Sequence, residues 1–456
     1  MRNRPPRLVP GGSPSTPALS RRGVLGAGAL AATGLSLSGC STPLGAGLLG
    51  SELDPGTVVY WNLFGGGDGV RMQDMQAAYR EQHGPGSLQA TTLTWGNPYY
   101  SKLTLSTVGN QPPDVAVAHL TRAKPLWAGG LLEAITEEDL AGVGLSTTDF
   151  NEQAWSTQVT DGQNIAIPID THPFTLFYHR EVCEQAGLLD GDGLLIDLSG
   201  KDTFEAALAE ISAVTGGLAI TVANVSETST PWRFFWTLYN QLETATPFLS
   251  EDGAVLSVDE DSFLTVMTTI QEWVEKGWLN SNLDYATSQT EMFTGKAGFY
   301  LQGEWEIATA QSIEGLDFGM APIPQLFDRP AVQADSHTFI LPRKDRSPEQ
   351  RRLAMQFIKA MLEQSLLWAE GGHIPSYLPT FESPEFQALE PQRHYASSAD
   401  HAVYDDPAWY GGSGSTFEDT VGAQLGLVQQ GASTPERALA AIRSQLEIYT
   451  STPSPL

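Results

Sequence analysis

The chain is 456 residues long, and its 53 acidic residues outnumber its 25 basic residues, so its formal net charge is −28. Such an acidic excess argues against nucleic acid as a partner, because binding to phosphates depends on clustered lysine and arginine. It also disfavours an anionic ligand unless arginines gather locally. About 400 residues follow the N-terminal segment, more than one hydrophobic core usually supports, so we expect two domains.

The N-terminal segment predicts an export signal. Residues 1–39 carry five arginines and no acidic residue, and Arg21 and Arg22 directly precede the apolar stretch 23–37. This order is typical of the basic and hydrophobic regions of a signal peptide. At fifteen residues, rich in Gly and Ala, the apolar stretch is shorter than the roughly 20 residues that a membrane-spanning helix needs.

Two short motifs refine this prediction by resemblance. The run 37–40, Leu-Ser-Gly-Cys, resembles the bacterial lipobox, and the run 20–25 resembles the twin-arginine export motif. The resemblance implies a signal peptide over 1–39, a lipid on Cys40, and a flexible linker over 40–54. It places the protein at the cell surface, anchored outside the cytoplasmic membrane. Export through the general secretory route remains an alternative, as does a purely structural Cys40.

Cys183 is the only cysteine besides Cys40. Once Cys40 is acylated, an intramolecular disulfide is excluded, so the fold must depend on its hydrophobic core.

The first part of the following chain alternates between two kinds of pattern. β-Prone runs occupy 57–61, 88–95 and 114–119, and helical patterns occupy 70–82 and 99–108, with Asp68 as a candidate N-cap. Strands that alternate with helices predict an α/β lobe with a largely parallel sheet. Ligands bind at the carboxyl ends of such strands, which directs attention to the residues that follow each strand.

Two extended segments interrupt the later part of the chain. The segment 165–173 is bounded by prolines and leads into the β-prone run 174–178, and the segment 335–341 is also extended. We interpret both as crossings between lobes. The remaining patterns are helices at 203–214, 232–241, 263–276, 348–362 and 435–449, a strand at 297–301, and a loop region rich in Pro, Gly and Ser between the last two helices.

A series of short motifs along residues 55–450 carries a family resemblance. The motifs lie at 61–68, 113–119, 168–173, 178–181, 303–306, 320–324, 335–337 and 372–375. In this order they resemble the extracellular solute-binding proteins of ABC importers, of the carbohydrate-binding type related to maltose-binding protein.

The resemblance implies a two-lobed α/β fold of the periplasmic-binding-protein type, with two discontinuous lobes joined by crossing strands. The first lobe would comprise 55–169 and 339–395, and the second 170–338 and 396–450. It also implies a binding protein without enzymatic activity, cofactor or metal. The protein would capture a neutral sugar or oligosaccharide between the lobes and deliver it to a membrane permease.

A pyranose offers apolar faces that stack on aromatic rings and hydroxyls that pair with carboxylates and imidazoles. The candidate stacking residues are Phe64, Trp95, Trp232, Trp305 and Trp409. The candidate hydroxyl partners are Asp68, His119, Asp170, His172, Glu304 and His373, with Asn62, Asn97 and His337 as weaker choices. Each ring could instead belong to the core. Asp170 and His172 could fix the hinge, and His337 could be a buried structural histidine.

Two other functions remain open at this point. A surface glycosidase would need two carboxylates on either side of a sugar, and the sequence contains no G-x-S-x-G, H-E-x-x-H or P-loop motif. A protein for glycerol-phosphate-type or other charged solutes would need a basic residue in the cleft. Arg71, Arg122 and Arg233 are the basic side chains near the candidate loops.

Overall fold

The structure, a computed structural model, describes residues 54–455. The predicted signal peptide, its arginines Arg21 and Arg22, the lipidation site Cys40 and the linker up to residue 53 lie outside the described residues. Cys183 is buried and carries a free thiol. No helix within the described residues has both the length and the apolar character needed to cross a bilayer.

The first sheet has five strands in the order β2-β1-β3-β12-β6. These strands are β1 (Val58–Asn62), β2 (Leu88–Thr92), β3 (Val115–His119), β6 (Ile167–Pro168) and β12 (His337–Ile340). Strand β1 runs parallel to β2 and β3, whereas β12 is antiparallel to β3 and β6. Every residue of β3 is buried, since it lies between β1 and β12.

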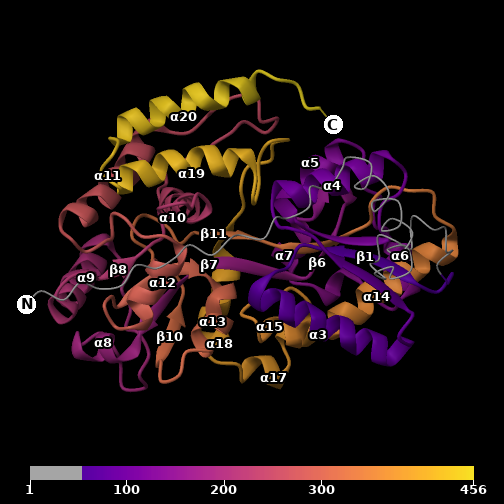
Figure 1. The fold of residues 1–456 in the computed structure, drawn as a ribbon, viewed down its shortest axis with the longest axis horizontal. Coiled ribbons are helices and arrows are strands. Elements are labelled where there is room, and N and C mark those ends of the chain that lie inside the picture. Colours follow the sequence, from indigo (N-terminus) through magenta and orange to yellow (C-terminus); the bar gives the residue numbers. More distant parts are fainter. Residues whose placement is uncertain (1–53, 456) are drawn as a thin grey trace, which may run out of the picture. The chain divides into compact units, whose positions relative to one another are not determined.

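Helices cover this sheet and share its hydrophobic core (Figure 1). They are α3 (Gly66–His83), α4 (Asn97–Val108), α5 (Leu120–Ala128), α6 (Glu137–Gly142), α7 (Glu152–Ser156), α14 (Pro348–Glu363) and α15 (Ser365–Ala369). A 3-10 turn, η1 (Thr147–Asp149), and a small hairpin of β4 (Val159–Thr160) and β5 (Gln163–Asn164) complete this part.

The second sheet is built around one long strand. Strand β7 (Asp170–His179) lies between β11 (Val332–Asp335) and β9 (Phe299–Gly303), which are both antiparallel to it. The outer strands are β8 (Ile220–Thr221) and β14 (Ala402–Val403), and β10 (Phe318–Ala321) and β13 (Ile374–Pro375) also pair with β7. All but the last residue of β7 are buried, as expected for the middle of a sheet.

The remaining helices lie in the part of the molecule that holds this second sheet, where the C-terminal helix packs mainly on other helices (Figure 1). They are α8 (Arg180–Gln185), α9 (Lys201–Thr215), α10 (Ser229–Asn240), α11 (Glu260–Glu275), α12 (Tyr285–Phe293), α13 (Ile307–Gln311), α16 (Leu378–Phe381), α17 (Pro384–Gln387), α18 (Gln392–Tyr395), α19 (Thr416–Gln429) and α20 (Pro435–Thr450). The 3-10 turns η2 (Glu304–Glu306) and η3 (Ala396–His401) lie in the same part.

The chain passes between the two sheets at two very short connections. Only Ile169 separates β6 of the first sheet from β7 of the second, and only Ser336 separates β11 from β12. Both predicted extended segments therefore run from one sheet into the other. The predicted fold class, two α/β lobes that are each discontinuous in sequence, is confirmed.

Two local predictions were wrong. Asp68 is not the N-cap of α3, because the helix begins at Gly66 with Gly65 as its cap, so Asp68 lies in the first turn. The loop region predicted after α14 contains α19. Its glycines suggested a loop, but Gly422 serves close packing, since a Cβ at this position would lie 1.8 Å from the carbonyl oxygen of Thr228.

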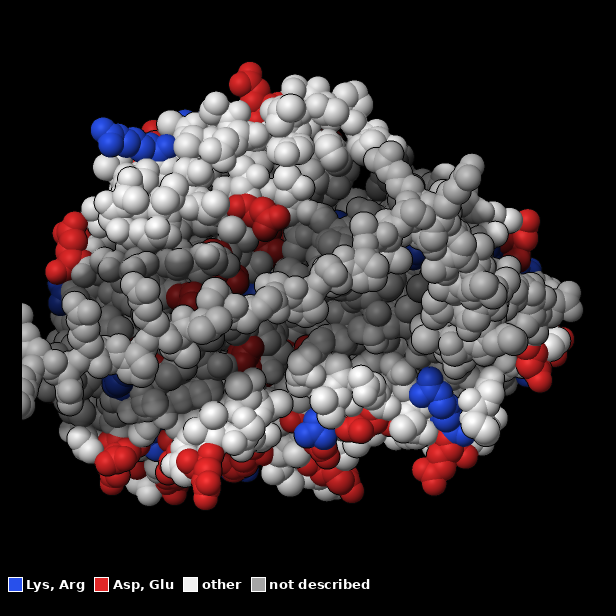
Figure 2. Space-filling view, viewed as in Figure 1, with Lys and Arg blue, Asp and Glu red and all other residues white. Residues whose placement is uncertain are grey.

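The surface carries much of the acidic excess. Figure 2 shows acidic side chains along the lower edge of one face, with basic side chains among them. This distribution agrees with a charge that keeps the protein in solution.

Candidate functional site

Strand register brings polar side chains together where the two sheets meet. His119 at the end of β3 pairs with His337 on β12, and Asp335 on β11 pairs with His172 on β7. Asp170 and His172 are two residues apart on β7 and therefore share one face of the strand. The result is a group of buried side chains from both sheets at their junction.

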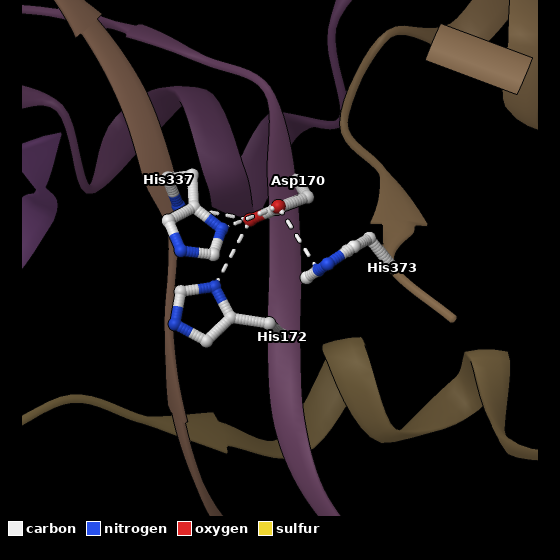
Figure 3. Close-up of side chains that lie close together, drawn as sticks. All are labelled: Asp170, His172, His337 and His373. Carbon is white, nitrogen blue, oxygen red and sulfur yellow. Dashed lines mark hydrogen bonds and ion pairs between the residues drawn. The ribbon is translucent and has the colours of Figure 1, made fainter. Parts of the chain in front are cut away.

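Asp170 is the centre of this group, which we call the junction cluster: Asp170, His172, His337 and His373 (Figure 3). Its Oδ1 accepts hydrogen bonds from Nδ1 of His172 at 3.1 Å and from the backbone N–H of His337 at 2.8 Å. Its Oδ2 accepts from Nδ1 of His337 at 2.8 Å and from the indole of Trp368 at 2.6 Å. The Asp170 side chain is fully buried, so these donors replace its hydration.

His373 joins the junction cluster from the turn that precedes β13. Its Nδ1 lies 3.3 Å from Oδ2 of Asp170 and 3.0 Å from Oε1 of Glu304, while its Nε2 lies 3.1 Å from Oδ1 of Asp68. The Trp368 ring stacks on the imidazole with centroids 4.1 Å apart. His373 is thus held between three carboxylates and one indole.

The protonation states follow from these contacts. Burial alone would raise the pKa of Asp170, but His337 and His172 hold it well below its usual value. Burial and the neighbouring His337 lower the pKa of His172 to about 3. Asp170 is therefore ionised and His172 neutral at neutral pH.

The pKa values of two further groups at the junction, Glu304 and His373, are raised instead of lowered. Burial raises the pKa of Glu304 to about 7, although His373 opposes this shift. Burial alone would lower the pKa of His373, but Asp68 and Glu304 hold it well above its usual value. In the protein alone, His373 therefore carries a positive charge among the carboxylates.

Aromatic rings extend the junction on both sides. Trp95 follows β2 of the first sheet, is 41% exposed, and lies 6.3 Å from the ring of His119. Trp305 follows β9 of the second sheet, and its ring centroid lies 6.1 Å from that of His172. The Arg233 guanidinium sits 4.9 Å from the Trp305 ring centroid. Position 303 must be glycine, because a Cβ there would lie 2.0 Å from the Trp305 ring.

The structure places most of the predicted site residues in one connected group. Phe64 joins it through ring contacts with His337 at 4.8 Å and with Trp368 at 4.6 Å. The predicted residues that it brings together are Phe64, Asp68, Trp95, His119, Asp170, His172, Glu304, Trp305 and His373, with His337 among them.

Two predicted tryptophans lie elsewhere. Trp232 is fully buried in the core of the second sheet and donates its indole N–H to Asp405 at 3.0 Å. Trp409 packs against Tyr410 and Tyr449, beside a hollow of about 430 Å³ that also contacts Arg122. Neither ring contacts the junction cluster.

The weaker candidates make local contacts. The side-chain oxygen of Asn62 accepts hydrogen bonds from the backbone N–H of Phe64 and the hydroxyl of Thr92. The side-chain oxygen of Asn97 accepts from Arg122 at 3.2 Å.

The sequence did not point to Trp368 or to the role of Arg233. Trp368 lies in a five-residue helix, too short to show a periodic pattern. Arg233 was visible as a basic residue near a candidate loop, but its position over Trp305 and 3.6 Å from Glu418 depends on tertiary contacts.

Solved structures with this fold are plentiful, although no curated protein matches the chain in sequence. The GacH receptor of Streptomyces glaucescens, solved unliganded and with acarbose, has a TM-score of 0.68 at 16% identity, covering 87% of this chain and 99% of that one. The sugar-binding protein MalE of Xanthomonas citri has a TM-score of 0.69 at 15% identity, covering 87% and 97%. UgpB of Mycobacterium tuberculosis, solved with glycerophosphocholine, has a TM-score of 0.69 at 16% identity, covering 87% and 99%.

These likenesses confirm the two-lobed α/β fold. In addition, the sequence profile described as bacterial extracellular solute-binding protein matches residues 74–389, more than half of the 456 residues. The chain belongs to the family of bacterial extracellular solute-binding proteins.

Proposed function

We propose that this protein captures a neutral sugar or oligosaccharide at the junction of its two lobes and delivers it to the permease of an ABC importer. One observation supports the proposal: aromatic and imidazole rings from both sheets form a row across the junction. The ring centroids of Trp95 and His119 are 6.3 Å apart, those of His119 and His172 are 5.5 Å apart, and Trp305 follows at 6.1 Å from His172.

Such a row suits a sugar, because the indole rings can stack on its apolar faces while imidazoles and carboxylates pair with its hydroxyls. A ligand that touches both lobes would stabilise a closed form through contacts made only in that form. The sugar-bound relatives, such as the GacH receptor with acarbose, support this choice of solute.

The lobes would divide the chain at its crossings. The predicted boundary at 338/339 falls inside β12, whose four residues all belong to the first sheet. Ile374 on β13 and Tyr395 on α18 pack with Phe177 of the second sheet. We therefore place 55–169 and 337–373 in the first lobe and 170–336 and 374–450 in the second.

The binding test is calorimetry on the full chain with neutral mono- and oligosaccharides. Stacking a sugar face of some 60–80 Å² on a ring contributes about 1.5–2 kcal/mol at roughly 25 cal/mol per Å². Trp305→Ala should therefore weaken binding about 10- to 30-fold. The matched control is Trp278→Ala, since Trp278 is half-buried and contacts Lys276 away from the junction. Equal loss in both variants, or turnover of the sugar instead of saturable binding, would contradict the proposal.

Arg233 favours a second candidate, a glycerophosphodiester, because a phosphate needs a basic partner in the cleft. The likeness to UgpB solved with glycerophosphocholine points the same way. Arg233 is, however, 3.6 Å from the buried carboxylate of Glu418, which offsets its charge. Glycerophosphocholine in the same titrations, with Arg233→Gln as the variant, decides between the two solutes.

We also propose that a lipid on Cys40 holds the protein at the outer face of the cytoplasmic membrane. Cys40→Ala should release it into the medium. Replacing Arg21 and Arg22 by lysine should block its export if the twin-arginine route is used, whereas normal surface display of that variant would leave the general secretory route.

A further inference from the structure

The junction cluster has the composition of a metal site. Asp170, His172, His337 and His373 each offer one ligand atom, and these four atoms all lie within 4.8 Å of one another. We propose that the four residues bind one divalent transition-metal ion of the zinc class at the junction of the two sheets. This inference does not depend on the proposed function.

The donor set fits zinc and its neighbours among the first-row metals. Three imidazole nitrogens and one carboxylate oxygen are ligands that zinc commonly takes, whereas calcium and magnesium prefer oxygen alone. In a tetrahedral zinc site, bonds of about 2.0–2.2 Å place neighbouring ligand atoms about 3.4 Å apart. Oδ2 of Asp170 lies 2.8 Å from Nδ1 of His337 and 3.3 Å from Nδ1 of His373, and Oδ1 lies 3.1 Å from Nδ1 of His172. The four ligand atoms lie within 4.8 Å of one another, so the imidazoles would have to close by up to about 1.4 Å to reach this spacing.

Buried carboxylate oxygens beside the junction cluster are incompletely satisfied by hydrogen bonds. Within residues 54–455, both carboxylate oxygens of Glu304 are buried without a well-formed hydrogen bond, and Nδ1 of His373 faces only carboxylate oxygens. His373 Nδ1 and Glu304 Oε1 are 3.0 Å apart, an ion-pair contact. A buried atom left in this state is costly, and a cation among these atoms would satisfy them.

The surroundings of the cluster are anionic. Asp68, Asp170 and Glu304 contact its histidines, and within residues 54–455 no lysine or arginine forms an ion pair with any of them. A divalent ion would supply positive charge beside these three carboxylates.

Outer contacts already orient the ligands. Asp68 holds Nε2 of His373 at 3.1 Å, which turns Nδ1 toward the cluster, as carboxylates do behind metal-bound histidines. The indole of Trp368 and the backbone N–H of His337 fix the Asp170 carboxylate in the same way. The side chains are thus arranged before any ion arrives.

The main test is zinc titration of the purified full chain after stripping with a chelator. We expect one zinc ion per chain, and binding about 100-fold weaker or worse in His337→Asn and in His172→Asn, because loss of an outer partner alone weakens metal affinity about 10- to 100-fold. His401→Gln is the matched control, since His401 is an exposed histidine of η3. No saturable uptake by the stripped protein, or equal uptake by the variants and the control, would overturn the proposal.

X-ray absorption of the zinc-loaded wild-type protein keeps the test decisive if a ligand variant fails to fold. The expected spectrum has the imidazole scattering of three histidines and one oxygen ligand; fewer than two histidines would overturn the proposal. Asp68→Asn tests the positioning role of Asp68, and we expect weaker zinc binding with an unchanged absorption spectrum. Because Trp305 is not a metal ligand, Trp305→Ala should leave zinc binding intact, so failure of the sugar proposal and failure of the metal proposal are distinguishable.

Discussion

Asp170 at the junction and Asp405 in the core of the second lobe are two buried carboxylates with one partner type in common. Each accepts a hydrogen bond from an indole, from Trp368 at 2.6 Å and from Trp232 at 3.0 Å. Asp170 also faces imidazoles, whereas Oδ2 of Asp405 is buried without a hydrogen-bond partner.

The difference in partners reverses the ionisation of the two groups. The pKa of Asp170 is well below the usual value, because His337 and His172 outweigh burial. The pKa of Asp405 is raised well above the usual value by burial and by the nearby carboxylate of Glu418. Burial alone therefore does not mark a functional carboxylate; the groups around it decide whether it is held as an anion that can bind a cation.

The largest difference in the free energy of unfolding is expected when each of the two carboxylates is replaced by asparagine. Asp170→Asn should lower the free energy of unfolding by about 3–5 kcal/mol, because it removes the charged partner of a buried network. Asp405→Asn should not lower it and should raise it at neutral pH, since the amide matches the protonated acid in charge and size but needs no proton uptake on folding. Urea unfolding at neutral pH with a chelator present measures both; similar losses in the two variants would show that the partners do not matter.

A smaller effect is expected when the two indoles are compared. Trp368→Phe removes a hydrogen bond to an ionised carboxylate, for which about 1.5–3 kcal/mol is typical, in addition to the loss of ring volume. Trp232→Phe removes a bond to a protonated one, for which about 0.5–1.5 kcal/mol is typical. The difference between the variants in urea unfolding is informative, because both lose the same atoms. A larger loss for Trp232→Phe would reverse our assignment of the two ionisation states.

The smallest effect, counted per pH unit, is the pH dependence of stability. The pKa of Asp405 is higher in the folded protein than its ordinary value of 3.8, which applies to the unfolded chain. Above pH 3.8 the folded state therefore binds more protons than the unfolded state. The free energy of unfolding therefore falls as pH rises through this window, by at most about 1.4 kcal/mol per pH unit. Asp405→Asn should remove this slope. Parallel stability curves for variant and wild type between pH 4 and 8 would mean that Asp405 ionises normally.

The sequence was sufficient for the order of elements and for part of the site. Strand β3 ends at His119 as predicted, and the prolines of 165–173 mark the crossing that carries Asp170 and His172. The sequence could not show that His337 and His373 meet Asp170, because strand pairing between distant segments brings them together.

Trp232 shows a residue that the sequence predicted for the site and that the structure places in the core. Its helix, α10, has apolar residues at helical spacing, which predicts one buried face. The structure buries every residue of α10, so a ring that the pattern allowed to face a ligand lies in the core instead. Whether a helix is covered on one side or on all sides depends on later segments, here α11 and α19, that the local pattern does not describe.

The single residues Ile169 and Ser336, which join strands of different sheets, have a mechanical consequence. Rotation of one sheet against the other would turn about backbone torsions at these two points and at the third passage between the lobes, beside His373, and displacement grows with distance from such a pivot. Asp170 and His337 adjoin the pivot directly, so they would hardly move while Trp95 and Trp305 swing apart. An ion bound at the pivot, as proposed above, would stay in place through such a rotation, whereas a solute held between the two rings, also as proposed, would be released by it.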